Sequence, residues 1–418
     1  MKTDYSMTHP QSKASQWFLR EAWWLYGYLP DGVGDFLKKH YRYLLPFKNL
    51  RITVSILRGK TPLSSQEVTV LFANRKNAET DYLTDHFFDG QYKLEIVENV
   101  WSWNLASTLR LLRQSTDLTI ARIDRVSARL FFSRDYIAVP EWVSLSLPVS
   151  EGLKIPPRLS RSLKDDLRIV RRSNLHPHYT QSISDYDTFY NEMYVPFIQR
   201  RYGEKAYIRN FYQLRRSLKQ GGLLRVMQNN KPIAGLLFKR RGQLLQILAL
   251  GTLNGERMLV KAGALTACYL FILEHAKELG CELLDFGGCR PLLNDGLLRY
   301  KRKWGMIINE KHDTYYDYLV YINNFSREVI SLLSNNPLIF RDNGGLSAIS
   351  LMDGENPAAE TEVERAHHSM WIPGLRQLYL VSASGWKENT RSPVNTRLVD
   401  TKTLENCRGR LFEEYHGR

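Results

Sequence analysis

The order of the elements predicted between residues 179 and 321 is the feature that most constrains the fold of this chain. Three apolar runs, Leu223–Gln228, Pro232–Lys239 and Leu244–Gly251, follow one another, and residues 229–231 and Gly242 separate them with hairpin turn residues. They predict an antiparallel meander of three strands. Since such strands pair with their neighbours, this segment is expected to form a sheet and not a helical bundle.

Periodic segments flank this meander along the chain, with apolar residues at intervals of three and four in the helices and short apolar runs in the strands. The predicted order is strand, two helices, three strands, helix, strand, helix and two strands, at residues 179–183, 184–200, 208–220, 223–228, 232–239, 244–251, 258–279, 282–286, 295–304, 307–311 and 315–321. We expect these strands to form one mixed sheet, with 244–251 and 282–286 side by side at its centre.

The composition is that of a globular protein of two or three domains, because 43% of the 418 residues are apolar and 24% are charged. Disordered, collagen-like and coiled-coil chains are excluded. The longest uncharged, mostly apolar stretch covers residues 262–273, which is shorter than the ~20 residues of a membrane-spanning helix. No secretory signal is visible, and the four cysteines lack CxxC spacing. We therefore expect a soluble, cytoplasmic protein.

The formal net charge of +15 is concentrated in one region. Between Gln199 and Arg241 the sequence has twelve Lys or Arg residues and a single acidic residue, Glu204. Such a segment favours phosphate-rich or acidic partners, such as nucleic acid, a phosphorylated cofactor, a nucleotide sugar, an anionic membrane or an acidic carrier protein. The alternative is that these residues are only the solvated faces of two helices.

The predicted order of elements resembles that of the GNAT acyltransferases. The segment LLDFGGCRPLLNDGLLRYKRKWG, Leu283–Gly305, is similar to the signature of the Fem-type (FemAB-type) branch, in which Asp-Phe-Gly-Gly ends a strand and an aromatic-Lys pair precedes a Gly. Segments within Met193–Phe238 also resemble that branch. The resemblance covers residues 158–321 and implies an α/β fold with tandem GNAT-like lobes, each a mixed, mostly antiparallel sheet flanked by helices.

Three domains follow from this resemblance. Residues 1–150 are predicted to form an N-terminal GNAT-like lobe, since they contain strand-like runs at 50–57, 67–73, 94–97 and 118–123. Residues 151–335 form the predicted acyltransferase lobe. Residues 336–418, with a strand-like run at 377–381, are predicted to be an appendage of unknown role. An aromatic helix at 16–28 lacks a basic face, which favours packing over membrane anchoring.

The resemblance implies an N-acyltransferase that moves an acyl group from a thioester, acyl-CoA or an acyl carrier protein, to an amine on a cell-envelope or polysaccharide precursor. No permanently bound cofactor is expected. The first alternative is an aminoacyl-tRNA-dependent transferase that builds the peptide bridges of a cell-wall precursor. The second is a basic scaffold or nucleic-acid binder without catalysis.

Lys301 matches the family's aromatic-Lys pair together with Tyr300, and the resemblance implies that the lysine stabilises the reacting carbonyl or its oxyanion. In the predicted helix, Leu297, Tyr300 and Trp304 form the buried stripe, and Lys301 borders it. Arg299, Arg302 and Lys303 point to solvent or to phosphate. The alternative for Lys301 is a lysine whose stem covers apolar surface.

Asp285 interrupts an apolar strand, so it needs a hydrogen-bond partner or a position at the mouth of a site. It is a candidate to orient the acceptor amine or to take its proton. The structural alternative is that it accepts hydrogen bonds from the amides of Gly287 and Gly288. These glycines indicate either a turn with φ > 0 or the close approach of a ligand.

Residues 252–257 occupy the place of the loop that binds pyrophosphate in relatives that use acetyl-CoA. The sequence has Gly255 and Arg257 there but lacks the glycine spacing of that loop, so a CoA donor is open. The basic segment 158–172, which ends in Arg171 and Arg172, either contacts the donor's phosphates or links the lobes. His176, His178 and the pair at 367–368 lack a third ligand, so no metal site is expected.

Overall fold

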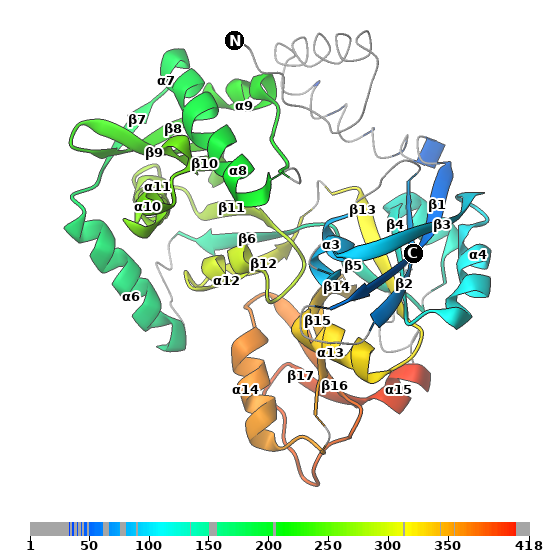
Figure 1. Cartoon of the computed structure of the whole chain (residues 1–418). Helices are drawn as coiled ribbons and strands as arrows, with labels where there is room; N and C mark the ends of the chain where they lie inside the picture. Colours follow the sequence, from blue (N-terminus) through cyan, green and yellow to red (C-terminus); the bar gives the residue numbers. More distant parts are fainter. Residues whose placement is uncertain are drawn as a thin grey trace. The chain divides into compact units, whose positions relative to one another are not determined.

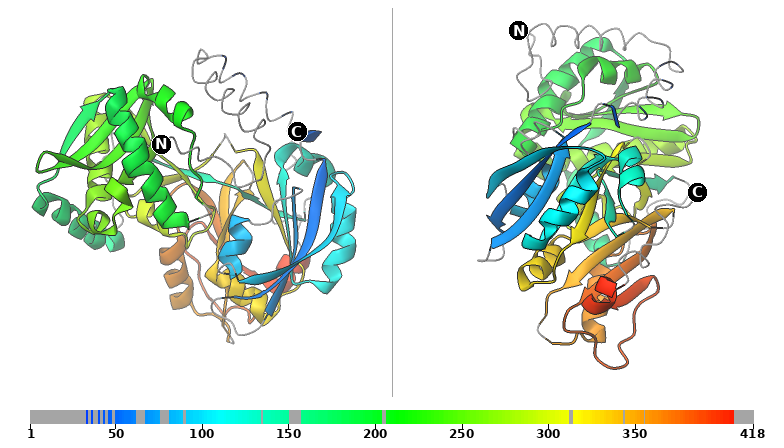
Figure 2. Two further views of the ribbon diagram at one scale, coloured as in Figure 1. Left: turned by 45° about the horizontal axis from the view of Figure 1, so that its top comes forward. Right: turned by 90° about the vertical axis from the view of Figure 1, so that its right-hand side faces the viewer.

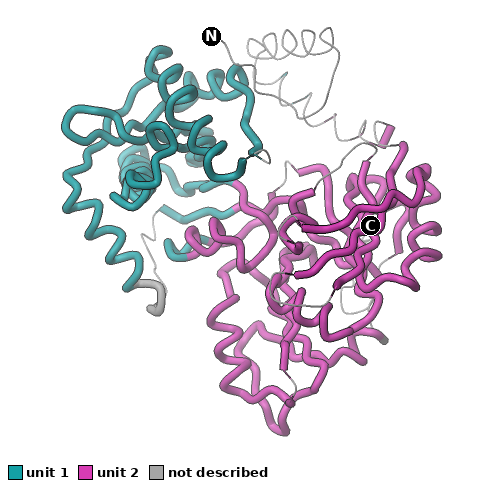
Figure 3. Tube along the Cα trace, in the orientation of Figure 1, with its two compact units in different colours: residues 1–39, 145–287, 303–306 teal, residues 40–144, 288–302, 307–418 magenta. Residues whose placement is uncertain are grey.

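The structure is a computed structural model that describes residues 33, 36, 40, 43, 46, 47 and 50–406, except 62–66, 76–80, 89–90, 134, 150–156, 204–205, 312–313, 343 and 355. The predicted aromatic helix at 16–28 lies outside these residues. The chain divides into two compact units (Figure 3): unit 1 comprises residues 1–39, 145–287 and 303–306, and unit 2 comprises residues 40–144, 288–302 and 307–418. Three mixed sheets with flanking helices occur in the described part, which confirms the predicted α/β class.

Unit 1 contains strands in the order β6-β11-β10-β9-β8-β7, green to yellow-green in Figure 1 apart from the cyan β6 and the green-cyan β7. Its elements are β6 (Val143–Pro148), α6 (Pro157–Arg172), β7 (His176–Thr180), α7 (Ile183–Thr188), η2 (Phe189–Tyr194), α8 (Val195–Tyr202), α9 (Phe211–Leu218), β8 (Gly221–Gln228), β9 (Lys231–Arg241), β10 (Leu244–Thr252), η4 (Leu253–Gly255), α10 (Arg257–Lys261), α11 (Ala264–Glu278) and β11 (Leu283–Cys289).

The pairing in unit 1 confirms two predictions. Strands β7 to β10 pair antiparallel with their neighbours, as expected for a meander whose turns contain Asn229, Asn230 and Gly242. The three turn residues have positive φ, which Gly and Asn tolerate better than other residues. Strands β10 and β11 lie side by side and are parallel.

Helices cover both faces of this sheet. On one face, η2 packs so closely that a Cβ at Gly235 would lie 2.5 Å from the Phe189 ring. On the other face, α11 places His275 against Phe238, with ring centroids 5.5 Å apart. Gly235 and Phe238 are three residues apart on β9, so they point to opposite faces. Strand β9 is therefore covered on both faces, whereas the edge strand β7 is largely exposed.

The predicted single helix at 258–279 is wrong, because the structure has two helices there. α10 ends at Lys261, Gly263 takes a left-handed φ of 88°, and α11 begins at Ala264. The break follows from contact with α6, since a Cβ at Gly263 would lie 3.2 Å from the Cγ2 atom of Val170. A helical pattern that continues through a glycine does not show this contact.

Unit 2 has a six-stranded sheet in the order β3-β1-β2-β4-β13-β5. Its elements before residue 338 are β1 (Arg51–Lys60), β2 (Glu67–Arg75), α3 (Tyr82–Phe88), β3 (Tyr92–Trp101), α4 (Leu105–Leu112), η1 (Arg113–Ser115), β4 (Leu118–Asp124), α5 (Arg125–Phe131), β5 (Ile137–Pro140), α12 (Gly296–Arg302), β12 (Ile307–Glu310), β13 (Tyr316–Ile322) and α13 (Arg327–Asn335). The four strand-like runs of the N-terminal segment are β1 to β4.

The expectation of one sheet from 179 to 321 is wrong at its last strand. β13 pairs antiparallel with β4 and β5, so it belongs to the six-stranded sheet of unit 2. Its Asp317 accepts bonds from Arg125 at the start of α5 and from Arg341. These partners are distant in sequence. The apolar pattern of residues 315–321 therefore indicates that a strand forms but not which sheet it joins.

A four-stranded sheet, orange to red in Figure 2, follows at the C-terminal end of unit 2. Its elements are β14 (Leu338–Asp342), β15 (Gly345–Met352), α14 (Glu360–Met370), β16 (Leu375–Ser382), β17 (Thr396–Asp400) and α15 (Thr401–Asn406). The predicted strand at 377–381 lies in β16. β14 pairs antiparallel with β15, and β15, β16 and β17 are parallel.

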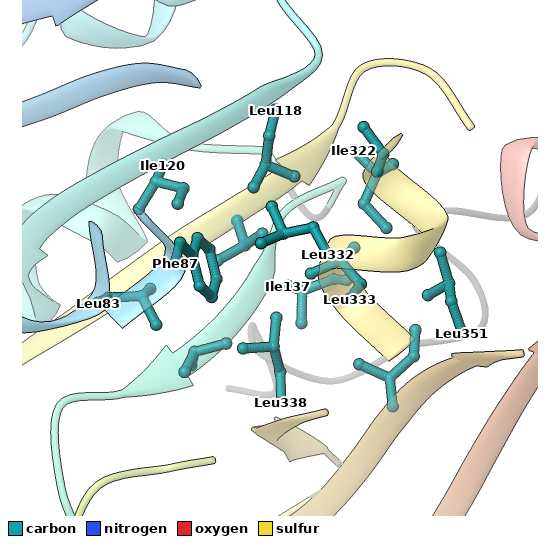
Figure 4. Packing of buried hydrophobic residues seen from close by; sticks show 14 of the residues in the cluster. Leu83, Phe87, Leu118, Ile120, Ile137, Ile322, Leu332, Leu333, Leu338 and Leu351 are labelled. Carbon is teal, nitrogen blue, oxygen red and sulfur yellow. The ribbon is translucent and has the colours of Figure 1, made fainter. Parts of the chain in front are cut away.

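One hydrophobic cluster joins the two sheets of unit 2 (Figure 4). It places Leu338 and Leu351 of the C-terminal sheet with Leu118 and Ile120 of β4 and with Phe87 of α3. All five side chains are at most 2% exposed. Each such burial contributes roughly 1.5–3 kcal/mol. Residues 338–404 therefore share the core of the six-stranded sheet. Among the described residues, no helix is both long and apolar enough to cross a membrane.

Candidate active site

Strands β10 and β11 separate after a short parallel pairing. Their register covers Leu244 to Gln246 against Leu283 to Asp285. Beyond it, β10 continues to Thr252 and β11 to Cys289, and the register of β10 with β9 shifts between Ile247 and Ala249. Where two strands diverge, the backbone N–H and C=O groups on their facing edges become available to a ligand in extended form. This divergence is the feature on which the site is built.

Asp285 stands at the last paired position. Its Oδ2 accepts a hydrogen bond of 2.7 Å from Nε2 of Gln246, the residue opposite in the register. Its Oδ1 accepts a bond of 2.8 Å from the N–H of Gly287, whose φ is 74°. Asp285 thus accepts the hydrogen bond from the Gly287 amide that its structural alternative predicts. A Cβ at Gly287 would lie 3.5 Å from the Ile247 carbonyl oxygen, so this turn lies against β10.

Lys301 is buried on α12, with 2% of its surface exposed. Its Nζ donates a hydrogen bond of 3.3 Å to the carbonyl oxygen of Gly288. Asp285 thus bonds Gly287 within unit 1, and Lys301 bonds Gly288 within unit 2. Buried ammonium groups require such partners, because an uncompensated buried charge is costly.

The predicted buried stripe of this helix is wrong in register. The buried side chains are Leu298, Lys301 and Trp304, whereas Leu297 and Tyr300 are half-buried. The helix begins beneath Asp295, whose Oδ1 accepts bonds from the N–H groups of residues 297 and 298. The rotation that this start imposes turns Lys301 inward. A prediction that places lysine at the surface therefore chooses Leu297 and Tyr300 as the buried side chains in place of Leu298 and Lys301.

The thiol of Cys289 lies beside Lys301 and is fully buried. Burial raises the pKa of the Cys289 thiol to about 11, although the Lys301 charge acts in the opposite direction. Burial likewise raises the pKa of Cys268 on α11 to about 12. Both groups are neutral thiols at pH 7, and the thiolate is the nucleophilic form. Neither thiol is therefore suited to act as a nucleophile at this pH.

Cationic and aromatic side chains surround Gly288 within unit 2. A Cβ at Gly288 would lie 3.2 Å from the Trp142 ring and 3.6 Å from Cδ of Lys311. The guanidinium of Arg290 lies 3.8 Å from the Trp142 ring centroid and 4.2 Å from that of Tyr82. With Lys301, these residues give the turn three nearby cations. Such a field stabilises negative charge that develops on a substrate oxygen.

Sequence reasoning missed Trp142, Lys311 and Arg290 as neighbours of the turn. Trp142 and Lys311 are distant in sequence from Gly288, and no local pattern connects them to it. Arg290 stands two residues after Gly288, and this short distance in sequence indicates that it lies near the turn. Gln246 was also missed, because the prediction that the two strands are neighbours gave neither their direction nor the register that places Gln246 opposite Asp285.

The other predicted binding residues are spread over the surface. Lys303 forms an ion pair of 3.7 Å with Asp166 of α6. Arg299 is exposed on α12, Tyr300 is half-buried, Arg257 is exposed at the start of α10, and Arg171 and Arg172 are exposed at the end of α6. Lys303 thus has an acidic partner.

Close packing against α8 explains why the loop at 252–257 has a glycine at position 255. Its φ is 65°, and a Cβ there would lie 2.7 Å from the Pro196 carbonyl oxygen of α8. Just before it, Thr252 ends β10 with a fully buried side chain whose hydroxyl has no hydrogen-bond partner among the described residues. A buried hydroxyl without a partner is rare. Thr252 is therefore a further candidate to contact a ligand.

Gly255→Ala is expected to destabilise the protein more than Gly280→Ala. Both glycines have a left-handed φ, which costs alanine roughly 1–2 kcal/mol. At Gly280 no atom lies within 4 Å of the added methyl group, whereas at Gly255 the methyl meets the Pro196 carbonyl. That overlap should add roughly 1–3 kcal/mol. Urea unfolding of both variants measures the difference, and equal losses would contradict the packing described for this loop.

The described part of the chain holds no group of three His, Cys, Asp or Glu side chains placed to bind a metal ion. His176 and His178 are exposed on β7. His367 of α14 has a different environment, since its Nδ1 lies 2.7 Å from the hydroxyl of Thr396 on β17. This hydrogen bond links α14 to the last strand of the C-terminal sheet and gives His367 a structural role.

No protein-family model matches the chain, and neither does any curated protein sequence. Solved structures do resemble it. FemX is 14% identical over 75% of this chain and 98% of its own, with a TM-score of 0.34. L-PGS from Bacillus licheniformis is 12% identical over 66% of this chain and 86% of its own, with a TM-score of 0.33.

A GCN5-related N-acetyltransferase from Sphaerobacter thermophilus is 13% identical over 50% of this chain and 61% of its own, with a TM-score of 0.28. FemX and the GCN5-related N-acetyltransferase carry names of the groups that the sequence resembles. All three TM-scores are below 0.5, so the fold of unit 1 is described by the order and pairing of its own strands.

Proposed function

We propose that this protein is an N-acyltransferase that moves an acyl group from a thioester donor, acyl-CoA or an acyl carrier protein, to an amine. The observation that carries the proposal is the divergence of β10 and β11 beside the Asp285–Gly288 turn. Such a divergence offers backbone groups to an extended donor and brings a glycine turn to the reacting end. The sequence resemblance to Fem-type enzymes favours a cell-envelope or polysaccharide precursor as the acceptor.

The proposed reaction is direct attack. The neutral amine nitrogen attacks the carbonyl carbon of the thioester, the resulting oxyanion collapses, the C–S bond breaks and the thiolate leaves. Lys301 donates a hydrogen bond to the oxyanion, and Asp285 accepts the proton that the amine loses. Proximity supplies much of the rate, so the residues that position the donor matter as much as these two.

An aminoacyl-tRNA donor is the second candidate, and one observation favours it. Five basic residues of α6 are exposed, namely Arg161, Lys164, Arg168, Arg171 and Arg172. Among them, Arg168 has an acidic partner, Asp165, at 3.3 Å. A helix with this many exposed cations suits a partner with many phosphates.

The two donors are separated by two measurements. With a thioester donor, adding an amine acceptor to the protein and an acyl-CoA should release free thiol at a rate proportional to protein concentration. With tRNA, binding should weaken steeply with salt, its log affinity falling by about 0.7–0.9 per phosphate contact for each tenfold rise in salt. Thiol release with only weak tRNA binding supports the first proposal. Micromolar, salt-dependent tRNA binding without thiol release contradicts it.

A further inference from the structure

Unit 2 contains a small polar cavity at the end of α4. It has a volume of 220 Å³ and is lined by Ala106, Arg110, Arg113, Ser133, Asp135 and Tyr136. This volume is below the range of roughly 300–1,000 Å³ that is typical of sites for drug-sized ligands. The cavity therefore suits a molecule of a few heavy atoms, or one terminal group of a larger molecule.

Two guanidinium groups face this cavity from the same side. Arg110 lies in the last turn of α4 and Arg113 begins η1, so a spacing of three residues puts both on one face of the helix. Ala106, one turn earlier, leaves room beside them. In the described part of the chain, neither guanidinium has a carboxylate within ion-pair distance.

The guanidinium of Arg113 is held in place by aromatic rings. Its central carbon lies 4.2 Å from the ring centroid of Tyr321 on β13. Tyr136 packs against Tyr321, with ring centroids 5.4 Å apart and the rings tilted by 53°. A cation over a ring face loses mobility and keeps its N–H groups available at its edge. Arg113 is therefore oriented before any ligand binds.

Among the described lining residues, Tyr136 and Asp135 have opposite effects on an anion. Burial raises the pKa of the Tyr136 hydroxyl, so at pH 7 it is a neutral hydrogen-bond donor. Asp135 carries a negative charge, and its Oδ2 accepts a bond of 3.0 Å from the Ser133 hydroxyl. Two arginines against one aspartate leave an excess of positive charge in the cavity.

We propose that this cavity binds a small molecule through a phosphate or carboxylate group held between Arg110 and Arg113. Both anions match the planar, multiple donors of guanidinium groups, which bind them through paired hydrogen bonds. Tyr136 supplies a further hydrogen-bond donor, whereas the Asp135 carboxylate repels the bound anion and weakens its binding. The site lies in a different unit from β10 and Thr252, and it does not depend on the proposed acyl transfer.

The test is calorimetric titration of the full chain with inorganic phosphate and, separately, with succinate. We expect saturable binding of at least one probe, and the tighter one identifies the preferred group. Arg110→Gln should raise its Kd about tenfold or more, the loss expected for one charge-assisted hydrogen bond. Asp135→Asn should lower the Kd, because it removes the repulsion.

The matched control is Arg129→Gln, an exposed arginine of α5 that does not line the cavity. It changes the net charge by the same amount as Arg110→Gln, and the Kd should stay within about twofold. Equal effects of the two variants would show a long-range charge effect and overturn the proposal. Absence of saturable binding by both probes, or weaker binding by Asp135→Asn, would also overturn it.

Discussion

Lys301→Met is expected to lower kcat by a factor of roughly 10² to 10³ while KM changes little. Methionine keeps the length and bulk of the stem but cannot donate to the oxyanion. The substrate carbonyl carries little charge before attack, so the lost interaction belongs to the transition state. Steady-state kinetics with the acyl donor and amine identified by the thiol-release assay measure both constants.

Lys303→Met is the control for this prediction. Lys303 stands on the same segment and carries the same charge, but it pairs with Asp166 at 3.7 Å and is 29% exposed. Its replacement should change kcat less than about threefold, since exposed ion pairs contribute little. If Lys301→Met and Asp285→Asn both keep full turnover, the proposed roles are wrong, and Thr252 together with the backbone of β10 becomes the next candidate.

A structural role of Lys301 predicts a different result. Its hydrogen bond to the Gly288 carbonyl is lost in Lys301→Met, and an unpaired buried carbonyl costs roughly 1–3 kcal/mol. The urea midpoint of the variant reports this cost. If kcat falls only at temperatures where the variant is partly unfolded, Lys301 supports the turn and does not act on the substrate. A loss of kcat that persists well below the unfolding transition supports the proposed role.

The meander of unit 1 could be predicted because its information is local. Asn229, Asn230 and Gly242 specify the turns, and each turn brings together strands that are adjacent in sequence. The prediction that β10 and β11 are neighbours followed from the element order and from their apolar runs, and their parallel direction comes from the structure. These predictions required no knowledge of contacts between distant segments.

The errors have a common physical cause, which is that distant contacts decide the outcome. Gly263 interrupts a helical pattern because α6 packs against it, and β13 enters the sheet of β4 through partners more than a hundred residues away. Lys301 is buried, and the Gly288 carbonyl oxygen accepts a hydrogen bond from its ammonium group. The residues around Gly288, Trp142 and Lys311, likewise come from other segments. Periodicity cannot indicate any of these contacts.

Asp317 is the buried carboxylate on which the second large effect is expected. Its side chain has no solvent exposure, and it lies between the guanidiniums of Arg341, at 3.2 Å, and Arg125, at 3.4 Å. Glu310 pairs with the same two arginines. These four charged side chains link β13 to α5, β14 and β12. Each arginine contacts both carboxylates, so the removal of one charge affects all the others.

Asp317→Asn is expected to lower the free energy of unfolding by about 3–5 kcal/mol, because Arg125 and Arg341 are then left with the single charge of Glu310 and the cluster carries an excess positive charge. Asparagine has nearly the same shape, so no cavity forms, and the loss reports the removed charge together with one hydrogen-bond acceptor replaced by a donor. The control is Asp165→Asn in the exposed pair with Arg168, where about 0–1 kcal/mol is expected. Urea unfolding of both variants provides the comparison. Adding Arg125→Met to Asp317→Asn should recover part of the stability, because it removes the excess positive charge and leaves Arg341 paired with Glu310. If the double variant is less stable than Asp317→Asn by the full cost of Arg125→Met alone, the two residues are not coupled and charge compensation is not what holds β13 in this sheet.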